Sequence, residues 1–249
     1  MSVIELKEVH KSFGSVHALD GLNCSIREGE VCAFLGHNGA GKTTTLRLLL
    51  GLLEPDQGDA SVFGCSPVTN GEAVRRMCGV VSEDTGLYEP LSVYENLIYY
   101  ADIYGLPRGE ANLRIHDLLE LFEMPDKCDL PVKGFSTGMK KKTALIRAML
   151  HRPRLLLLDE PTNGLDPVST MELRKMLLSL VKESHATIVL TTHNLEEAQK
   201  LCSKIIIFRH GRDIFTGNMD ELQKHPEYMD NGVFSLEKLY LMLEGGDGR

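Results

Sequence analysis

Residues 31–43 read V-C-A-F-L-G-H-N-G-A-G-K-T, and this stretch decides the fold. The first five residues form a continuous apolar run, which predicts a strand buried on both faces. The next eight fit G-x-x-x-x-G-K-[ST], in which glycines let the backbone wrap closely around phosphates so that successive N–H groups point at the anion. Lys42 then places a cation against the β- and γ-phosphates, and the Thr43 hydroxyl is a ligand for Mg²⁺. Since a helix is expected from Thr43 to Leu50, we predict a loop that binds a nucleoside triphosphate.

Two acids follow a second apolar run, Leu155–Leu158. A carboxylate at the C-terminal end of a buried strand lies at the edge where ligands bind in open α/β sheets. Asp159 is placed there to hold the hydration shell of Mg²⁺, and Glu160 to act as the general base on the attacking water. The acids alone are a weak signal, because any buried strand before a polar turn looks similar. Together with the loop at 36–43 they predict hydrolysis of the nucleotide.

Strands and helices alternate along most of the chain. Strands are expected near 60–63, 79–81, 155–158 and 187–190, with 204–208 as the last strand of the sheet, and helices over about 168–183 and 194–202. This order predicts an α/β fold of the P-loop NTPase type, with a mainly parallel sheet covered by helices. Residues 1–30, with turns at Gly14 and 28–30, are expected to form short strands of an N-terminal antiparallel β subdomain.

A block at about 86–151 has a different character and predicts a helical insertion. Ser92 and Glu95 fit a capping box, and the helix they begin stops before Pro107. Further helices are expected over 110–123 and 137–151. We therefore predict an ATPase domain over residues 1–220 with a helical subdomain at 86–151, and a short C-terminal extension over 221–249 with one helix and a disordered tail from Gly245.

Composition argues against several classes of protein. With 249 residues and 43% apolar content, the chain can bury a core of ordinary size. A formal net charge of −8 argues against a nucleic-acid partner. No apolar run approaches the ~20 residues that cross a bilayer, and no signal peptide is recognised, so we expect no direct membrane insertion. The six cysteines lack a C-x-x-C pair, which favours core packing for Cys32 and Cys202 over disulfide or metal roles.

The motifs together resemble those of ATP-binding-cassette ATPases over about residues 2–220. Residues 160–167, E-P-T-N-G-L-D-P, are similar to the acid and D-loop stretch of that family, and residues 135–139, F-S-T-G-M, to its signature motif. Thr192-His193 resembles the switch histidine, and Phe13 the aromatic residue that stacks on adenine. The family works as a head-to-tail dimer with two ATP molecules at its interface, which implies a homodimer or a pair with a sister cassette.

The resemblance assigns roles to residues. Glu160 and His193 would be catalytic, and the metal ligands would be Thr43, Glu83 and Asp159. ATP would be bound within the chain by Phe13, Gly36, His37, Asn38, Gly39, Ala40, Gly41, Lys42, Thr43 and Thr44. ATP of the other cassette would be contacted in trans by Ser136, Thr137, Gly138, Met139 and Asp166. From the residues themselves, Ser136 is a plausible cap for the helix through 140–142, whose N-terminus can face an anion.

Two positions depart from the family pattern. Thr137 stands where glycine is usual in the signature, and Glu83 where glutamine is usual in the Q-loop. Both resemble cassettes that serve exporter-type membrane subunits, and we expect altered rather than abolished hydrolysis. Five of the seven tyrosines lie between residues 88 and 104, close to Glu83. Either local packing or the docking of a permease helix explains them.

Three functions are compared. The preferred one is the ATPase subunit of a transporter, held by a separate polytopic permease on the cytoplasmic face of the cell membrane. The second is a cassette acting on nucleic acid or ribosomes, but the segment between Lys42 and Asp159 lacks heptads and the chain is acidic. The third is an ATP-sensing module with little turnover, which the presence of Glu160 and His193 disfavours. The transported substrate is not visible in the sequence.

Overall fold

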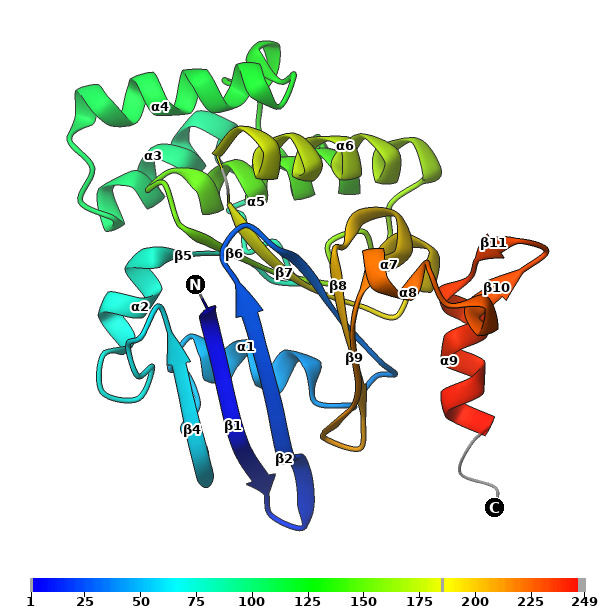
Figure 1. The fold of residues 1–249 in the computed structure, drawn as a ribbon. Coiled ribbons are helices and arrows are strands. Elements are labelled where there is room, and N and C mark those ends of the chain that lie inside the picture. Colours follow the sequence, from blue (N-terminus) through cyan, green and yellow to red (C-terminus); the bar gives the residue numbers. More distant parts are fainter. Residues whose placement is uncertain (1, 185, 246–249) are drawn as a thin grey trace.

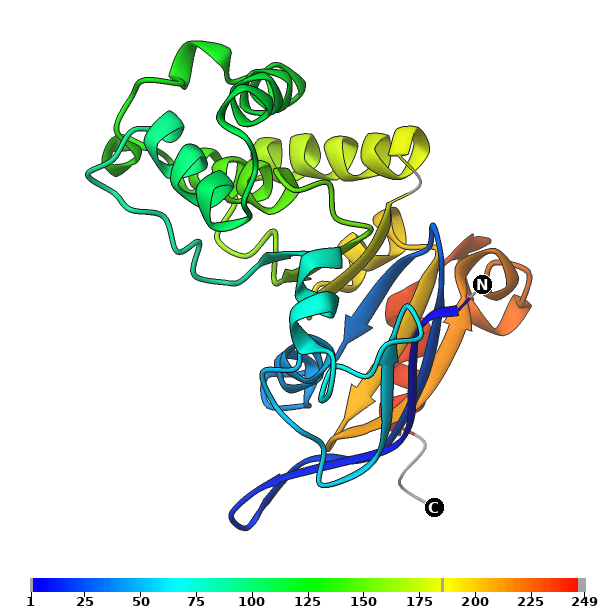
Figure 2. The same ribbon diagram turned by 90° about the vertical axis from the view of Figure 1, so that its left-hand side faces the viewer.

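The computed structural model describes residues 2–184 and 186–245. The expected disordered tail therefore falls, apart from Gly245, outside the described residues. Within the described part of the chain, no helix is both long and apolar enough to cross a bilayer. Figures 1 and 2 show the helical lobe (green) at one end of the molecule and an antiparallel sheet (blue) at the other.

A six-stranded sheet forms the centre, in the order β5-β6-β7-β3-β8-β9. Its strands are β3 (Val31–Leu35), β5 (Cys78–Val81), β6 (Leu155–Asp159), β7 (Thr187–Thr192), β8 (Lys204–Arg209) and β9 (Arg212–Asn218). All neighbouring pairs are parallel except β8 with β9. The mainly parallel sheet expected from the alternating pattern is thus confirmed. The prediction that residues 204–208 form the last strand is wrong, because β9 adds an antiparallel edge.

The strand β3 is buried on both faces, which explains the unbroken apolar run in its sequence. All five of its residues are buried. Successive side chains point to opposite faces of a sheet. Accordingly Val31, Ala33 and Leu35 enter a core that includes the helical lobe, while Cys32 and Phe34 enter the core beneath the antiparallel sheet. One short strand therefore ties both cores together and holds the loop that follows it.

The N-terminal antiparallel sheet has the order β2-β1-β4, with β4 at Gln57–Val62. The subdomain is confirmed, but its first strands are not short. The strands β1 (Ser2–Phe13) and β2 (Val16–Arg27) have 12 residues each. Register shifts between Leu6 and Val9 interrupt their pairing. Such bulges break the period-2 pattern, so one long strand looks like two in the sequence.

Two helices flank the first part of the sheet, α1 (Lys42–Leu49) and α2 (Gly71–Met77). The helix α1 was expected. The helix α2 was not, because Val74 is its one buried residue and it therefore carries no apolar stripe. The edge strand β9 was not predicted for a similar reason, since none of its residues is fully buried.

The helical lobe contains α3 (Val93–Ile103), α4 (Arg108–Leu121) and α5 (Thr137–Met149), with 3-10 turns at Pro125–Lys127 and Val132–Gly134. Ser92 and Glu95 form the predicted capping box. The expected inward face of α4, with Ile115 and Leu118, is buried. Because α5 also packs on β5, the lobe continues the core of the sheet.

The remaining elements are α6 (Pro167–Ser184), α7 (Leu195–Leu201), α8 (Met219–Leu222), a 3-10 turn at Pro226–Tyr228, β10 (Met229–Asp230), β11 (Val233–Phe234) and α9 (Leu236–Gly245). Residues beyond 220 are packed onto the domain, since Phe234, Leu236 and Leu239 are buried in the same core as α7. The domain boundary at residue 220 stays a prediction.

Candidate functional site

The loop at 36–43 is held in one shape by its glycines. Gly36 follows β3 with a φ of +153°, and a Cβ there would lie 2.5 Å from the backbone oxygen of Phe208. At Gly41 a Cβ would lie 2.7 Å from the oxygen of Ala18. Substitution at either position would therefore push the loop away from its neighbours. Both glycines are needed for packing as well as for access to phosphates.

Lys42 begins α1 at the end of this loop and is 5% exposed. Its ammonium group donates to the backbone oxygen of Gly36 and, at 3.3 Å, to that of His37. Those carbonyls are weaker partners than a phosphate oxygen, because charge-assisted bonds between ions are the stronger ones. The lysine is thus in position to change partner when a triphosphate enters the loop.

The carboxyl ends of β6 and β7 bring the acid and hydroxyl groups together. Thr43 Oγ1 lies 3.1 and 3.0 Å from the two carboxylate oxygens of Asp159. Thr191 Oγ1, on the neighbouring strand, donates to the same carboxylate at 2.6 Å. Residues 116 apart in the sequence are therefore in direct contact. The position agrees with the rule that ligands bind beyond the carboxyl ends of parallel strands.

These oxygens fit a magnesium ion. Mg²⁺ prefers hard oxygen ligands and is usually held by one or two protein groups together with phosphate oxygens and water. Among residues 2–184 and 186–245, no cluster of three or more His, Cys, Asp and Glu side chains could hold a metal on its own. Thr43 and Asp159 offer the small ligand set of a nucleotide-bound ion. Such an ion would neutralise charge on the β- and γ-phosphates.

Glu160 follows β6 and has the geometry of a candidate general base. It is 9% exposed, and its Oε2 lies 3.1 Å from His193 Nδ1. Its Oε1 lies 3.5 Å from the ammonium nitrogen of Lys42 and is buried, with no hydrogen-bond partner among the described residues. A buried, unpartnered acceptor oxygen at the edge of a phosphate cavity can take a proton from a water held there.

The backbone of Glu160 is held in an unusual conformation. Its φ is +46°, in the left-handed region that costs a non-glycine residue about 1–2 kcal/mol. Two anchors fix it there. Its N–H donates to Thr191, to the backbone oxygen at 3.2 Å and to Oγ1 at 3.0 Å. Its carbonyl accepts hydrogen bonds from Lys141 Nζ at 2.8 Å and from the Asn163 N–H at 3.1 Å.

Lys141 is a residue that the sequence interpretation missed. It belongs to a run of three lysines that looks like a solvated helix face, yet it is 4% exposed. Burial lowers the pKa of Lys141, while the nearby carboxylates of Glu83 and Glu160 raise it. The helical period was the available signal, because Lys141 is followed at helical spacing by the buried Ala144 and Leu145.

Glu197 is a second buried charge beneath the site, on α7, with 2% exposure. Its carboxylate accepts hydrogen bonds from the hydroxyl of Thr162 and, at 3.4 Å, from that of Thr192. Burial raises the pKa of Glu197, and the hydrogen bond from Thr162 opposes that shift. Glu197 joins the segment after Glu160 to the segment before His193, and the sequence pattern carried no sign of it.

A cavity of about 450 Å³ collects most of the predicted nucleotide site. It is lined by Phe13, Val16, Ala18, His37, Asn38, Gly39, Ala40, Gly41, Lys42, Thr43, Thr44, Glu83, Asp159, Glu160, Asn163 and His193. Phe13 lies at its rim and is 49% exposed, as a ring that stacks on a base would be. The adjoining Val16, Ala18 and Asn163 were not predicted, and the predicted Gly36 is not among the lining residues.

Glu83 follows β5 and lines this cavity with an exposed side chain. Its Oε1 accepts a hydrogen bond of 2.9 Å from Asn163 Nδ2. The structure thus places Glu83 in the nucleotide cavity, where its carboxylate contacts the side-chain amide of Asn163. Its proposed role as a metal ligand stays a prediction.

The five residues predicted to act in trans do not line this cavity. Ser136 caps α5 by accepting a hydrogen bond from the Met139 N–H. Asp166 accepts hydrogen bonds from the N–H groups of Val168 and Ser169. A Cβ at Gly138 would lie 2.9 Å from Ser169 Oγ, so the close approach of α6 requires glycine there. Within one chain, these residues shape two neighbouring helix starts.

The fold and the cavity define the class of protein: an α/β nucleotide-binding protein of the P-loop type. A family model described as ABC transporter matches residues 19–163, more than half of the chain. The chain is 36% identical to the bacitracin transport ATP-binding protein BcrA of Bacillus licheniformis, over 98% of this chain and 79% of that protein. It is 40% identical to the ABC transporter ATP-binding protein NatA of Bacillus subtilis (strain 168), over 90% of this chain and 91% of that one.

A solved structure of an ATP-binding subunit of an ABC transporter superposes with a TM-score of 0.83 at 32% identity, covering 97% of this chain and 99% of the other. This chain belongs to the ABC transporter family, as one of its ATP-binding, ATP-hydrolysing subunits. The family assignment made from the motifs is confirmed. The relatives are transporter subunits, so the nucleic-acid alternative is not favoured.

Proposed function

We propose that the protein hydrolyses MgATP to drive export of a substrate by a separate polytopic permease. The observation that carries this is the convergence of Lys42, Thr43, Asp159, Glu160 and His193 on one cavity. Lys42 and the loop N–H groups bind the phosphates, and Thr43 and Asp159 hold Mg²⁺. Glu160 takes a proton from the attacking water, and His193 holds the Glu160 carboxylate in place.

The working unit that we propose is a head-to-tail dimer, of two identical chains or of this chain with a sister cassette. The starts of α5 and α6 carry Ser136 and Asp166, yet neither lines the cavity of their own chain. A second cassette can cover the open cavity with these helix starts. N–H groups at the start of α5 would then face the γ-phosphate of the partner.

Export, rather than import, is the direction that we propose. One relative is named as a Nod factor export ATP-binding protein, from Ralstonia nicotianae, and is 37% identical over 90% of this chain and 69% of that protein. Thr137 and Glu83 are further support, since both departures resemble exporter-type cassettes. The protein then works on the cytoplasmic face of the membrane through its permease.

The permease docks, in this proposal, at a groove of about 610 Å³ between α2 and the end of α3. Its apolar lining consists of Leu50, Leu52, Val80, Ile103, Tyr104 and Leu106. Exposed Ile103 and Tyr99 lie four residues apart on one face of α3. Tyr88 packs edge-on against Tyr99, with 5.3 Å between the ring centroids. Because the groove reaches β5, a helix bound here is connected to Glu83 at the end of that strand.

The tyrosines of this region divide into two groups. Tyr94, Tyr100 and Tyr104 are half-buried and make packing contacts, with Asn112, Gly86 and His151 respectively. Tyr88 and Tyr99 are 47% and 44% exposed. The docking surface therefore includes the exposed pair. Local contacts account for Tyr94 and Tyr100, while Tyr104 both stacks on His151 and lines the groove.

The test is phosphate release by the purified protein, alone and with its permease in vesicles. We expect Mg²⁺-dependent hydrolysis that the permease stimulates. Glu160→Gln should still bind ATP but should lose at least about 10²-fold in turnover, because the amide cannot accept the proton. The same variant should accumulate as an ATP-bound dimer in size-exclusion chromatography. Parental turnover by Glu160→Gln would remove Glu160 from the mechanism.

A further inference from the structure

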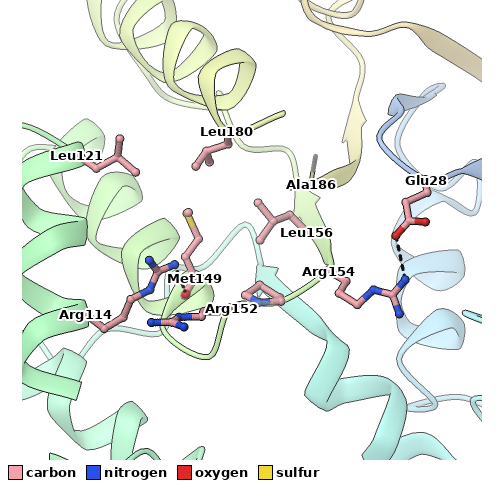
Figure 3. Close-up of a pocket in the computed structure, with 10 residues that line it drawn as sticks. Glu28, Arg114, Leu121, Met149, Arg152, Arg154, Leu156, Leu180 and Ala186 are labelled. Atoms are coloured by element: carbon pink, nitrogen blue, oxygen red, sulfur yellow. Dashed lines mark hydrogen bonds and ion pairs between the residues drawn. The ribbon is translucent and has the colours of Figure 1, made fainter. Parts of the chain in front are cut away.

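A second cavity, of about 540 Å³, opens at the opposite edge of the central sheet from the nucleotide site (Figure 3). It lies where β3, β6 and β7 begin, between α4, the end of α5 and α6. Its lining consists of Glu28, Arg114, Leu121, Met149, Arg152, Pro153, Arg154, Leu156, Leu180 and Ala186. Its volume falls in the range of about 300–1,000 Å³ that small-molecule sites occupy.

One part of the wall is apolar. Leu121, Met149, Leu156 and Leu180 come from four different elements and point toward the same space (Figure 3). Leu156 and Leu180 are 2% and 4% exposed, so they are rigid parts of the core rather than mobile surface groups. This wall can cover a short hydrocarbon chain.

The other part of the wall carries the cationic side chains of Arg114 and Arg152. Arg114 Nη2 donates to the backbone oxygen of Met149 at 3.2 Å, but its buried Nε has no hydrogen-bond partner among the described residues. Burial and the charge of Arg152 lower the pKa of Arg114, while the charge of Asp117 raises it. The carboxylate near Arg152 is that of Glu110, at 3.9 Å.

Arg154 differs from these two arginines. It forms a hydrogen-bonded ion pair of 2.9 Å with Glu28, at the side of the cavity away from Arg114 (Figure 3). Its charge is therefore matched within the chain. Arg114 is half-buried and Arg152 is largely exposed, and neither has a carboxylate at hydrogen-bond distance among the described residues. They form the part of the cavity where an added anion would find guanidinium donors.

We propose that this cavity binds a small anionic amphiphile, with a carboxylate or phosphate head on Arg114 and Arg152 and a short hydrocarbon chain along the four apolar side chains. Guanidinium groups bind both kinds of head through paired N–H donors. The cavity volume of about 540 Å³ favours a single short chain over a two-chain lipid.

Three elements that line this cavity have, at their other ends, residues that we assign to nucleotide binding, either in the same chain or in trans. The helix α5 begins after Ser136, β6 ends at Asp159, and α6 begins after Asp166. Along β6, Leu156 lines this cavity and Asp159 lines the nucleotide cavity, three residues or about 10 Å away. An amphiphile at this site therefore does not compete with ATP for space.

The test is calorimetric titration of the full chain with octanoate and octyl phosphate, each below its micelle concentration. Octanol is the control for the charge and acetate the control for the chain. We expect both amphiphiles to bind at least about tenfold more tightly than octanol or acetate, and saturating ATP to leave their affinity within about twofold.

Two variants test the assigned head group. Arg152→Gln removes a largely exposed side chain and should weaken octanoate binding about tenfold or more, as should Arg114→Gln. The matched control is Arg108→Gln. Arg108 lies on α4, the same helix as Arg114, but it pairs with Asp102 at 2.8 Å, outside the cavity. Each variant is checked for an unchanged melting temperature. Equal affinity for octanol and octanoate, unchanged binding by Arg152→Gln in the folded protein, or displacement of octanoate by ATP would each overturn the proposal.

Discussion

Lys141 lies outside the recognised motifs and holds the backbone of Glu160, and Lys141→Met tests whether hydrolysis depends on this contact. Methionine fills a similar volume without the ammonium group. The variant therefore removes the donor to the backbone oxygen of Glu160, at 2.8 Å in the parent, and leaves the packing of α5 largely intact.

The expected effect follows from the strain at Glu160. A hydrogen bond from a charged donor contributes about 1.5–3 kcal/mol, and the left-handed backbone of Glu160 costs about 1–2 kcal/mol. Without the charged donor, the Glu160 carbonyl keeps only the hydrogen bond from the Asn163 N–H, and Glu160 can relax away from its position. A misplacement of about 1 Å at a reacting group can cost about 10²-fold in rate. We expect kcat to fall about 10- to 100-fold, which is about 1.4–2.7 kcal/mol.

Binding of ATP should be nearly unaffected, because Lys42 and the loop remain. The assay is steady-state phosphate release, to obtain kcat, together with calorimetric titration of ATP, whose Kd should stay within about twofold. Lys141→Gln, which keeps an N–H donor at that position, should recover part of the rate. Lys140→Met is the matched control on the same helix, because it removes an ion pair to Glu89 at the surface.

Two results would refute the reasoning. Parental kcat in a folded Lys141→Met protein would show that Glu160 does not need the charged donor at its carbonyl. An equal loss in kcat and in ATP affinity, with a lower melting temperature, would show that Lys141 stabilises the fold in general and does not position the catalytic carboxylate.

Three further predictions concern the nucleotide cavity. Lys42→Ala should weaken ATP binding at least about 10²-fold by calorimetry, since it loses charge-assisted bonds of about 3 kcal/mol; unchanged affinity would remove Lys42 from the phosphate site. Glu83→Gln can keep the contact to Asn163, so ATP affinity should stay within about twofold while stimulation by the permease changes; identical stimulation would argue against a coupling role. Burial raises the pKa of Glu197 above its unfolded value of 4.5, so the folded protein loses stability as the pH rises from that value through the raised pKa. Glu197→Gln removes this loss, and its melting temperature relative to the parent should increase as the pH rises from 4.5; a constant difference would contradict the buried charge.

The sequence was sufficient to predict an element or a site where the functional residues and the buried residues lie in one short segment. The apolar run at 31–35 and the glycines after it predicted both the strand and the phosphate loop, because five buried residues in a row leave few alternatives to a central strand. The capping box at Ser92 predicted a helix start for the same reason: its hydrogen bonds join residues three apart.

Elements without a distinctive local pattern were missed. The helix α2 buries one side chain, and β9 is an edge strand without a fully buried residue, so neither shows a regular apolar period. In the first hairpin, bulges divided one long strand into pieces that looked separate.

By itself, the sequence determined the class of chemistry in this protein, since the loop, the two acids and the histidine are each recognisable within a few residues of chain. Tertiary structure alone decided which charges are buried and what they face. Lys141 and Glu197 look like surface residues, and folding places them beneath Glu160 and His193. Arg114 and Arg152 are also ordinary in the sequence, and the junction of α4, α5 and α6 makes them one wall of a cavity. The physical reason is that burial and charge pairing are set by contacts between segments far apart in the chain, which no local pattern encodes.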